Sequence, residues 1–291
     1  MESSAMKEIQ SIYGMEEFKL LAMKLKQVAD NQRKLSGARI QLPNYLFAVA
    51  PGCGVTTRIR QFSRLLDELH LIRYEGDRKY FEWMLDDSAF KNGGNFDRLL
   101  DQIRFVAGFR RNFYGIIGVD VDAWVEHADS PELMRLVDFA EDMMGQILIV
   151  FIVALREESK LQPIIRRISH EMPLEVIRIA MPGIEELVQC LSDFLKQRGF
   201  IVRSSAKEYF QRIMPQLIRS KQFDGFQSLD NLADEIVYHY CSGEITDSVY
   251  LTEKDVCFIE ENGGYIERLT AKGNTGNEET RRIGFGNGRD F

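Results

Sequence analysis

The chain has 291 residues, of which 45% are hydrophobic and 28% are charged. Because typical domains contain about 100–200 residues, we expect one large or two medium-sized domains of an ordinary soluble protein. The formal net charge of −7 argues against general nucleic-acid binding, which depends on lysine and arginine neutralising phosphates. The most apolar run, residues 147–155, is much shorter than the ~20 residues that span a bilayer, so no membrane span is expected.

Cysteine and histidine usage predicts a reduced protein without a metal site. The four cysteines lie far apart and form no C-x-x-C pair: Cys53, Cys190, Cys241 and Cys257. This pattern is typical of free thiols in a cytosolic protein rather than of a disulfide framework or a zinc site. The histidines do not cluster, and the first ten residues lack the apolar core of a signal peptide. We therefore expect a cytoplasmic location.

The first half of the chain alternates helical and strand patterns. Residues 6–35 carry apolar side chains at helical spacing, and residues 45–49 form an apolar run that predicts a buried strand. A glycine-containing turn and a further helical pattern follow that run. The expected elements after this helix are a second strand at 71–74, an irregular charged segment at 75–95 and an amphipathic helix at 96–106.

The second half begins with strand signals and ends with helices. Continuous apolar runs predict strands at 115–120, 147–155 and 176–179. Ser130 and Pro131 predict the start of the helix between the first two of these strands. Helical patterns then dominate, at 184–198, 205–218, 229–240 and 252–258.

This order of elements predicts an α/β fold, in which a parallel sheet has helices on both faces and a small helical lid domain follows. The expected boundaries are N-terminal leader helices at 1–36, an α/β core at 37–182, the lid domain at 183–270 and a flexible tail at 271–291. The tail is assigned from its many glycine and asparagine residues and its few apolar ones.

The turn after the first strand, residues 49–57, reads V-A-P-G-C-G-V-T-T. A phosphate-binding loop reads G-x-x-x-x-G-K-[ST], with the lysine on the outer phosphates and the hydroxyl on magnesium. Gly54 and Thr56 are in place. Val49 stands where the first glycine belongs, and Val55 stands where the lysine belongs. A β-branched residue at the first glycine position is expected to restrict the turn.

The loop resembles that of the AAA+ ATPases of the CbxX / stage V sporulation protein K type, G-N-P-G-x-G-K-T-T, with the Pro51-Gly52 pair as its most specific part. The resemblance covers roughly residues 6–258. Upstream, the run from Ile12 to Lys19 is similar to the family's leader signature, I-G-[LM]-E-x-[VF]-K. The resemblance implies the AAA+ fold for the whole of this region.

Later segments match the family with departures. The family's second motif is an apolar strand that ends in Asp-Glu, and here Asp120 is followed by Val121. Residues 147–155 resemble the sensor-1 strand. Residues 223–232 resemble the helix that usually carries the sensor-2 arginine, and no arginine occurs there. The lysine, the glutamate and the sensor-2 arginine are therefore all missing.

The resemblance implies a vestigial nucleotide site at seven positions: Gly52, Cys53, Gly54, Val55, Thr56, Thr57 and Asp120. Because phosphoryl transfer depends on positioning and electrostatic stabilisation, the three missing groups predict a module without catalytic residues that does not hydrolyse ATP. Two interpretations of the loop are open: a plain turn that binds nothing, and weak binding of ATP or ADP with Mg²⁺ through backbone amides. Arg58 is the nearby cation that could replace the lysine, and Asp122 the acid that could approach a water.

The implied function is that of a non-hydrolysing subunit, adaptor or scaffold that assembles with itself or with an active AAA+ partner, and a protein client is compatible with it. Arg166 and Arg167 match the position of the family's arginine finger, with an ion-paired basic turn as the alternative. Phe90 matches a pore-loop aromatic. The alternative function is an ATP-binding AAA+ ATPase or remodelling protein with an atypical nucleotide site, and a third is a scaffold that never forms rings.

Overall fold

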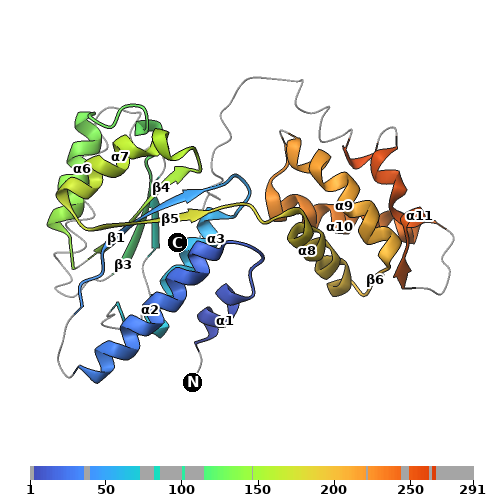
Figure 1. The fold of residues 1–291 in the computed structure, drawn as a ribbon, viewed down its shortest axis with the longest axis horizontal. Helices are drawn as coiled ribbons and strands as arrows, with labels where there is room; N and C mark the ends of the chain where they lie inside the picture. Colours follow the sequence, from blue (N-terminus) through green and yellow to red (C-terminus); the bar gives the residue numbers. More distant parts are fainter. Residues whose placement is uncertain are drawn as a thin grey trace. The chain divides into compact units, whose positions relative to one another are not determined.

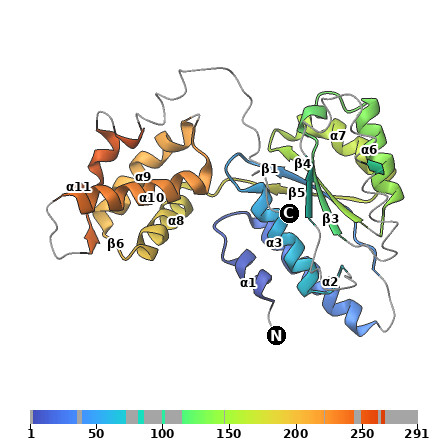
Figure 2. The ribbon, with the colours of Figure 1, turned by 180° about the vertical axis from the view of Figure 1, so that it is seen from behind.

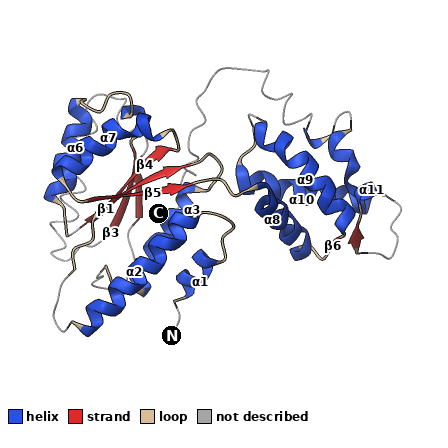
Figure 3. Ribbon diagram, viewed as in Figure 1, coloured by secondary structure: helices blue, strands red, loops and turns tan. Residues whose placement is uncertain are grey.

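The computed structural model describes residues 3–35, 40–72, 82–85, 100–101, 115–145, 147–220, 222–243, 249–261 and 264–266. The described residues form two compact units: the first lies within 3–50 and 55–180, and the second within 51–54 and 181–266. In the described residues the first unit contains a sheet with helices, whereas helices make up most of the second (Figure 3). Phe90, the tail and most of 96–106 lie outside the described residues.

The described part of the first unit contains a five-stranded parallel sheet in the order β2-β3-β4-β1-β5. Its strands are β1 (Asn44–Val49), β2 (Glu82–Leu85), β3 (Gly115–Asp120), β4 (Ile147–Ala154) and β5 (Leu174–Ile179). The central strand β4 is buried almost throughout, as its unbroken apolar sequence predicts. The parallel α/β fold class is therefore confirmed.

Helices cover both faces of the sheet, as Figures 1 and 2 show from opposite sides. On one face, Phe47 of β1 makes edge-on ring contacts with Phe18 and Phe62, at centroid distances of 5.9 and 5.5 Å. These rings belong to α2 (Glu16–Lys34) and α3 (Val55–Glu68). On the other face, Leu46 and Ala48 join one apolar core with α6 (Pro131–Asp142) and α7 (Glu158–Glu171). Successive residues of β1 thus face opposite layers.

The edge of the sheet differs from the sequence-based expectation. Residues 71–72 form a bend rather than a strand, and 73–74 lie outside the described residues. The strand β2 instead lies at Glu82–Leu85, inside the segment expected to be irregular, where it pairs with β3. An edge strand is stabilised by pairing with its neighbour. A short segment that begins with a charged residue can therefore form a strand although its own sequence shows no alternation of apolar and polar residues.

A short helix and a long one, both N-terminal, precede the sheet. The first, α1 (Ser4–Gln10), lies along α3 and buries Ala5, Met6 and Ile9. The connection to α2 contains Gly14 at φ 62° and Met15 at φ 58°. A left-handed methionine is unusual, so the side chain of Met15, which is 3% exposed, is held in that conformation by its packing.

The start of α6 follows the rule on which its prediction rested. Ser130 caps α6 through its side chain, which accepts a hydrogen bond from Leu133 N, and Pro131 occupies the first turn. This prediction is confirmed, because the Ser130 hydroxyl supplies a partner that a first-turn N–H group lacks within the helix. The short helix α11 (Glu253–Val256) follows Thr252, whose backbone N–H and hydroxyl both donate to Asp255 Oδ2 at 2.7 Å.

The second unit packs α10 (Gly225–Ser242) and α9 (Ser204–Arg219) against α8 (Ile184–Gln197). The short strands β6 (Ile201–Val202) and β7 (Tyr250–Leu251) pair in parallel beside these helices. The guanidinium of Arg198, the residue after α8, forms ion pairs with Asp230 and Asp234 of α10, at 2.8 and 2.6 Å. In the described segments, no helix combines the length and the apolar composition required to span a bilayer.

Candidate functional site

The glycine loop joins β1 to α3. Val49 is the last residue of β1, where it pairs with Ala154 and Ile179 in the neighbouring strands. The expectation that valine restricts the turn is wrong, because this position is still extended strand, which β-branched residues favour. The chain turns only afterwards, at Gly52 (φ 77°) and Gly54 (φ 69°), and these left-handed conformations are readily adopted only by glycine.

The helix that leaves the loop begins with the two residues at the lysine and hydroxyl positions of the phosphate-loop pattern, Val55 and Thr56. Val55 is the first residue of α3 and is 7% exposed. In the part of the chain that the structure describes, the Oγ1 atom of Thr56 is buried without a hydrogen-bond partner. Buried polar atoms normally have a partner, so this orphaned hydroxyl is consistent with a ligand group above the loop. The first N–H groups of a helix favour an anion at the same place.

Gly52 also makes a close contact within the second unit, to which residues 51–54 belong. A side chain on Gly52 would place its Cβ 2.3 Å from the backbone nitrogen of Gly225. A side chain on Gly225, itself at φ 52°, would come within 2.1 Å of the Gly52 carbonyl oxygen. Both positions therefore require glycine for lack of space as well as for backbone conformation.

The second motif lies at the same edge of the sheet as the loop. Asp120, the last residue of β3, pairs with Ile152 of β4, and Val49 pairs with Ala154 on the other side of the same strand. The carboxyl ends of these parallel strands thus bring Asp120 and the loop to one edge, where α/β sheets bind ligands. The Asp120 carboxylate accepts a hydrogen bond of 2.9 Å from Asp122 N.

The residues after Asp120 are structural. Val121 is fully buried in the core shared with α6 and α7. Asp122 Oδ1 accepts a hydrogen bond of 2.8 Å from Ala154 N, and its Oδ2 accepts one of 2.7 Å from Arg156. Asp122 therefore links the end of β3 to the end of β4. Because both of its carboxylate oxygens accept hydrogen bonds, the structure does not support a role for Asp122 in polarising water.

Replacing Asp122 with alanine is expected to lower the free energy of unfolding of the first unit by about 1–3 kcal/mol, because the Ala154 N–H loses its acceptor. The ion pair adds less, since both side chains are about one-third exposed. Urea unfolding followed by tryptophan fluorescence measures the change. Glu126→Ala, an exposed acid in the same segment, is the control, and an equal effect of the two substitutions contradicts the structural role.

The two arginine-finger candidates differ in their surroundings. Arg166 is exposed on α7. Arg167 is partly buried, contacts the Met134 sulfur and lies 3.8 Å from the Glu171 carboxylate. Arg167 thus has contacts within the unit and Arg166 is the more exposed of the two, and both stay predictions for contact with a neighbouring subunit.

Sequence reasoning missed a polar cluster on α3 that includes Arg58. Arg58 and Gln61 are 8% and 6% exposed, on a helix whose other buried residues are mostly apolar. The available signal was two large polar residues, Arg58 and Gln61, three positions apart on a helix face that also carries Ile59, Phe62 and Leu65.

Within the described residues, no group of three or more His, Cys, Asp or Glu side chains could hold a metal ion.

Comparison with solved structures shows which fold this is. A variant of Thermotoga maritima RuvB with an arginine-to-alanine substitution matches with a TM-score of 0.50 and 11% identity, over 85% of this chain and 69% of that chain. A proline-to-glycine variant of the same protein matches with a TM-score of 0.49 and 14% identity, over 86% and 70%. No protein-family model matches the sequence, and no curated protein does. The first likeness shows an AAA+-type fold, a parallel α/β sheet followed by a helical part.

Proposed function

We propose that this protein is an AAA+-like subunit or adaptor that has lost ATP hydrolysis. The observation that carries the proposal is the position of Val121. In the family that the sequence resembles, the residue after the strand-end aspartate is the glutamate that polarises water. Here that residue is valine, fully buried in the core, and the nearby carboxylate of Asp122 is bonded to β4. ATP hydrolysis needs a positioned water, and Val121 and Asp122 offer no replacement for the missing glutamate.

Residual nucleotide binding is part of the proposal. The left-handed Gly52 and Gly54 and the N-terminus of α3 present backbone N–H groups to a phosphate. Thr56 Oγ1 and Asp120 supply oxygen ligands of the kind that Mg²⁺ prefers, and the orphaned state of Thr56 Oγ1 supports this fit. ATP or ADP would then be bound without being hydrolysed.

The same proposal includes the assembly. The exposed Arg166 on α7 is suited to contact the nucleotide of a neighbouring subunit, in an assembly of this chain with itself or with an active AAA+ partner in the cytoplasm. This role does not require the chain's own site to hydrolyse ATP. Light scattering of the chain, alone and with candidate partners, separates this assembly from a scaffold that never forms rings.

The domain organisation proposed with this function is leader helices at 1–36, a core at 37–182, a lid domain at 183–270 and a tail at 271–291.

The test combines an ATPase assay with titration of a fluorescent ATP analogue. We expect no turnover, and binding that Mg²⁺ strengthens and Thr56→Ala weakens about threefold to tenfold, the scale of one lost polar contact. Ser159→Ala, an exposed hydroxyl on α7, is the control and should bind as the wild type does. Turnover that disappears in Asp120→Ala contradicts the loss of hydrolysis and supports the second candidate, an ATPase with an atypical site.

A further inference from the structure

A cavity of about 320 Å³ lies at the amino edge of the sheet, where three parallel strands begin. Its lining includes Asn44, Gly115 and Ile147, the first residues of β1, β3 and β4. The glycine loop and Asp120 lie at the opposite edge, where the same strands end. The strand β1 and the helix α3 each run from one edge to the other over about 20 Å, so the cavity is separate from the loop.

Apolar side chains form most of the described lining. Ile40 is 38% exposed, so part of this apolar surface meets solvent, and a ligand that covers it gains from the hydrophobic effect. A cavity of this size has room for about one or two small rings. The apolar side chains come from the segment before β1, the residues after α3 and the start of β4: Ile40, Leu42, Leu71, Ile72, Met144 and Leu148.

The side-chain amide of Gln41 is a polar group that the cavity offers to a ligand. Gln41 is exposed, and no hydrogen bond of the described residues involves its side chain. Its Nε2 atom lies beside Gly145, 3.9 Å from the place of a Cβ there. The Asn44 amide is engaged instead, because its Oδ1 accepts a hydrogen bond of 2.9 Å from Ile149 N. A glutamine amide presents one acceptor and two donors in a plane, so it can bond to both an acceptor and a donor on the edge of a flat ring.

His70 lines the same cavity in a strained backbone conformation. It has φ 58° and lies in a Schellman turn after α3, in which Leu71 N donates to Leu66 O at 3.0 Å. Glycine adopts this left-handed conformation without strain, whereas histidine does not. The turn itself therefore does not require an imidazole, and strain of this kind is typical of residues that serve a binding site.

We propose that this cavity binds an uncharged heteroaromatic molecule of one or two rings, with Gln41 bonding to the edge of the ring and His70 covering its face. The described lining contains no Lys, Arg, Asp or Glu, so a charged ligand would lose its hydration without gaining a counter-charge. The apolar walls and the imidazole favour a flat aromatic ligand. The inference does not depend on the proposed function, because neither the glycine loop nor Asp120 lines the cavity.

The experiment measures the affinities of benzimidazole and indene for the full chain at pH 8, by saturation-transfer NMR. Benzimidazole is uncharged at this pH and carries one N–H donor and one nitrogen acceptor, whereas indene is the same ring pair without nitrogen. We expect both to bind the wild type. Gln41→Leu should weaken benzimidazole about fivefold to tenfold, the scale of one hydrogen bond, and leave indene unchanged. Gln27→Leu removes an exposed glutamine from α2 and should change neither affinity.

His70→Gly removes the imidazole and keeps the left-handed backbone, so it separates binding from stability. We expect it to weaken both probes about threefold, while the temperature of thermal unfolding stays the same or rises. A wild type that binds neither probe overturns the site. Gln41→Leu overturns the role of the amide if it leaves benzimidazole unchanged or weakens both probes equally, and unchanged binding in His70→Gly overturns the role of the imidazole.

Discussion

Replacing Val121 with glutamate is expected to lower the free energy of unfolding of the first unit by about 3 kcal/mol or more, without restoring ATP hydrolysis. In the sequence, this substitution restores the Asp-Glu pair of the family's second motif. In the structure, however, Val121 is fully buried and packs in the core with Trp124 and residues of α6 and α7. A carboxylate there would lose its hydration with no cation described in that core, so the protein would be destabilised.

Urea unfolding followed by tryptophan fluorescence measures this loss, since both tryptophans, Trp83 and Trp124, belong to the first unit. Burial raises the pKa of a carboxyl group, so the folded variant would bind more protons than the unfolded chain. The loss of stability should therefore be larger at pH 8 than at pH 5. Met23→Glu, at a position 48% exposed on α2, is the control. A stable Val121→Glu variant that hydrolyses ATP contradicts the conclusion that position 121 belongs to the core and cannot serve the site.

The strands that could be predicted are those with continuous apolar sequence. Residues 45–49 and 147–155 predict β1 and β4 because a strand covered on both faces has few places for polar side chains. The strand β2 could not be found in this way, since it lies at the edge of the sheet and begins with Glu82. Its strand conformation depends on pairing with β3, and a pairing between segments distant in the sequence leaves no local pattern.

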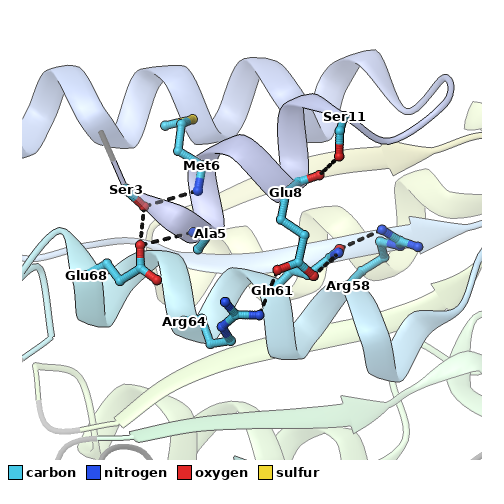
Figure 4. Close-up of polar contacts among 9 residues, drawn as sticks. All are labelled: Ser3, Ala5, Met6, Glu8, Ser11, Arg58, Gln61, Arg64 and Glu68. Atoms are coloured by element: carbon cyan, nitrogen blue, oxygen red, sulfur yellow. Dashed lines mark hydrogen bonds and ion pairs between the residues drawn. The ribbon is translucent and has the colours of Figure 1, made fainter. Parts of the chain in front are cut away.

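The candidate site was predictable only in part for a related reason. Gly52 and Gly54 predict a left-handed turn whatever surrounds them, and the structure has one. The environments of Val121 and Asp122 depend instead on α6 and β4, which pack against the end of β3. The hydrogen bonds that link Glu8 to Gln61 and Gln61 to Arg58 likewise join two helices (Figure 4). Motif spacing identifies which residues follow the strand, but only packing decides which of them can reach a ligand.

Replacing Val55 with lysine is expected to strengthen binding of Mg²⁺–ATP about 10- to 100-fold, because a charged hydrogen bond to phosphate is added to the backbone N–H groups. The ATPase assay should still show no turnover, since Val121 and Asp122 are unchanged. Val55→Met is the control, as it lengthens the side chain without a charge. Equal affinities of the lysine and methionine variants contradict the loop's capacity to hold a phosphate.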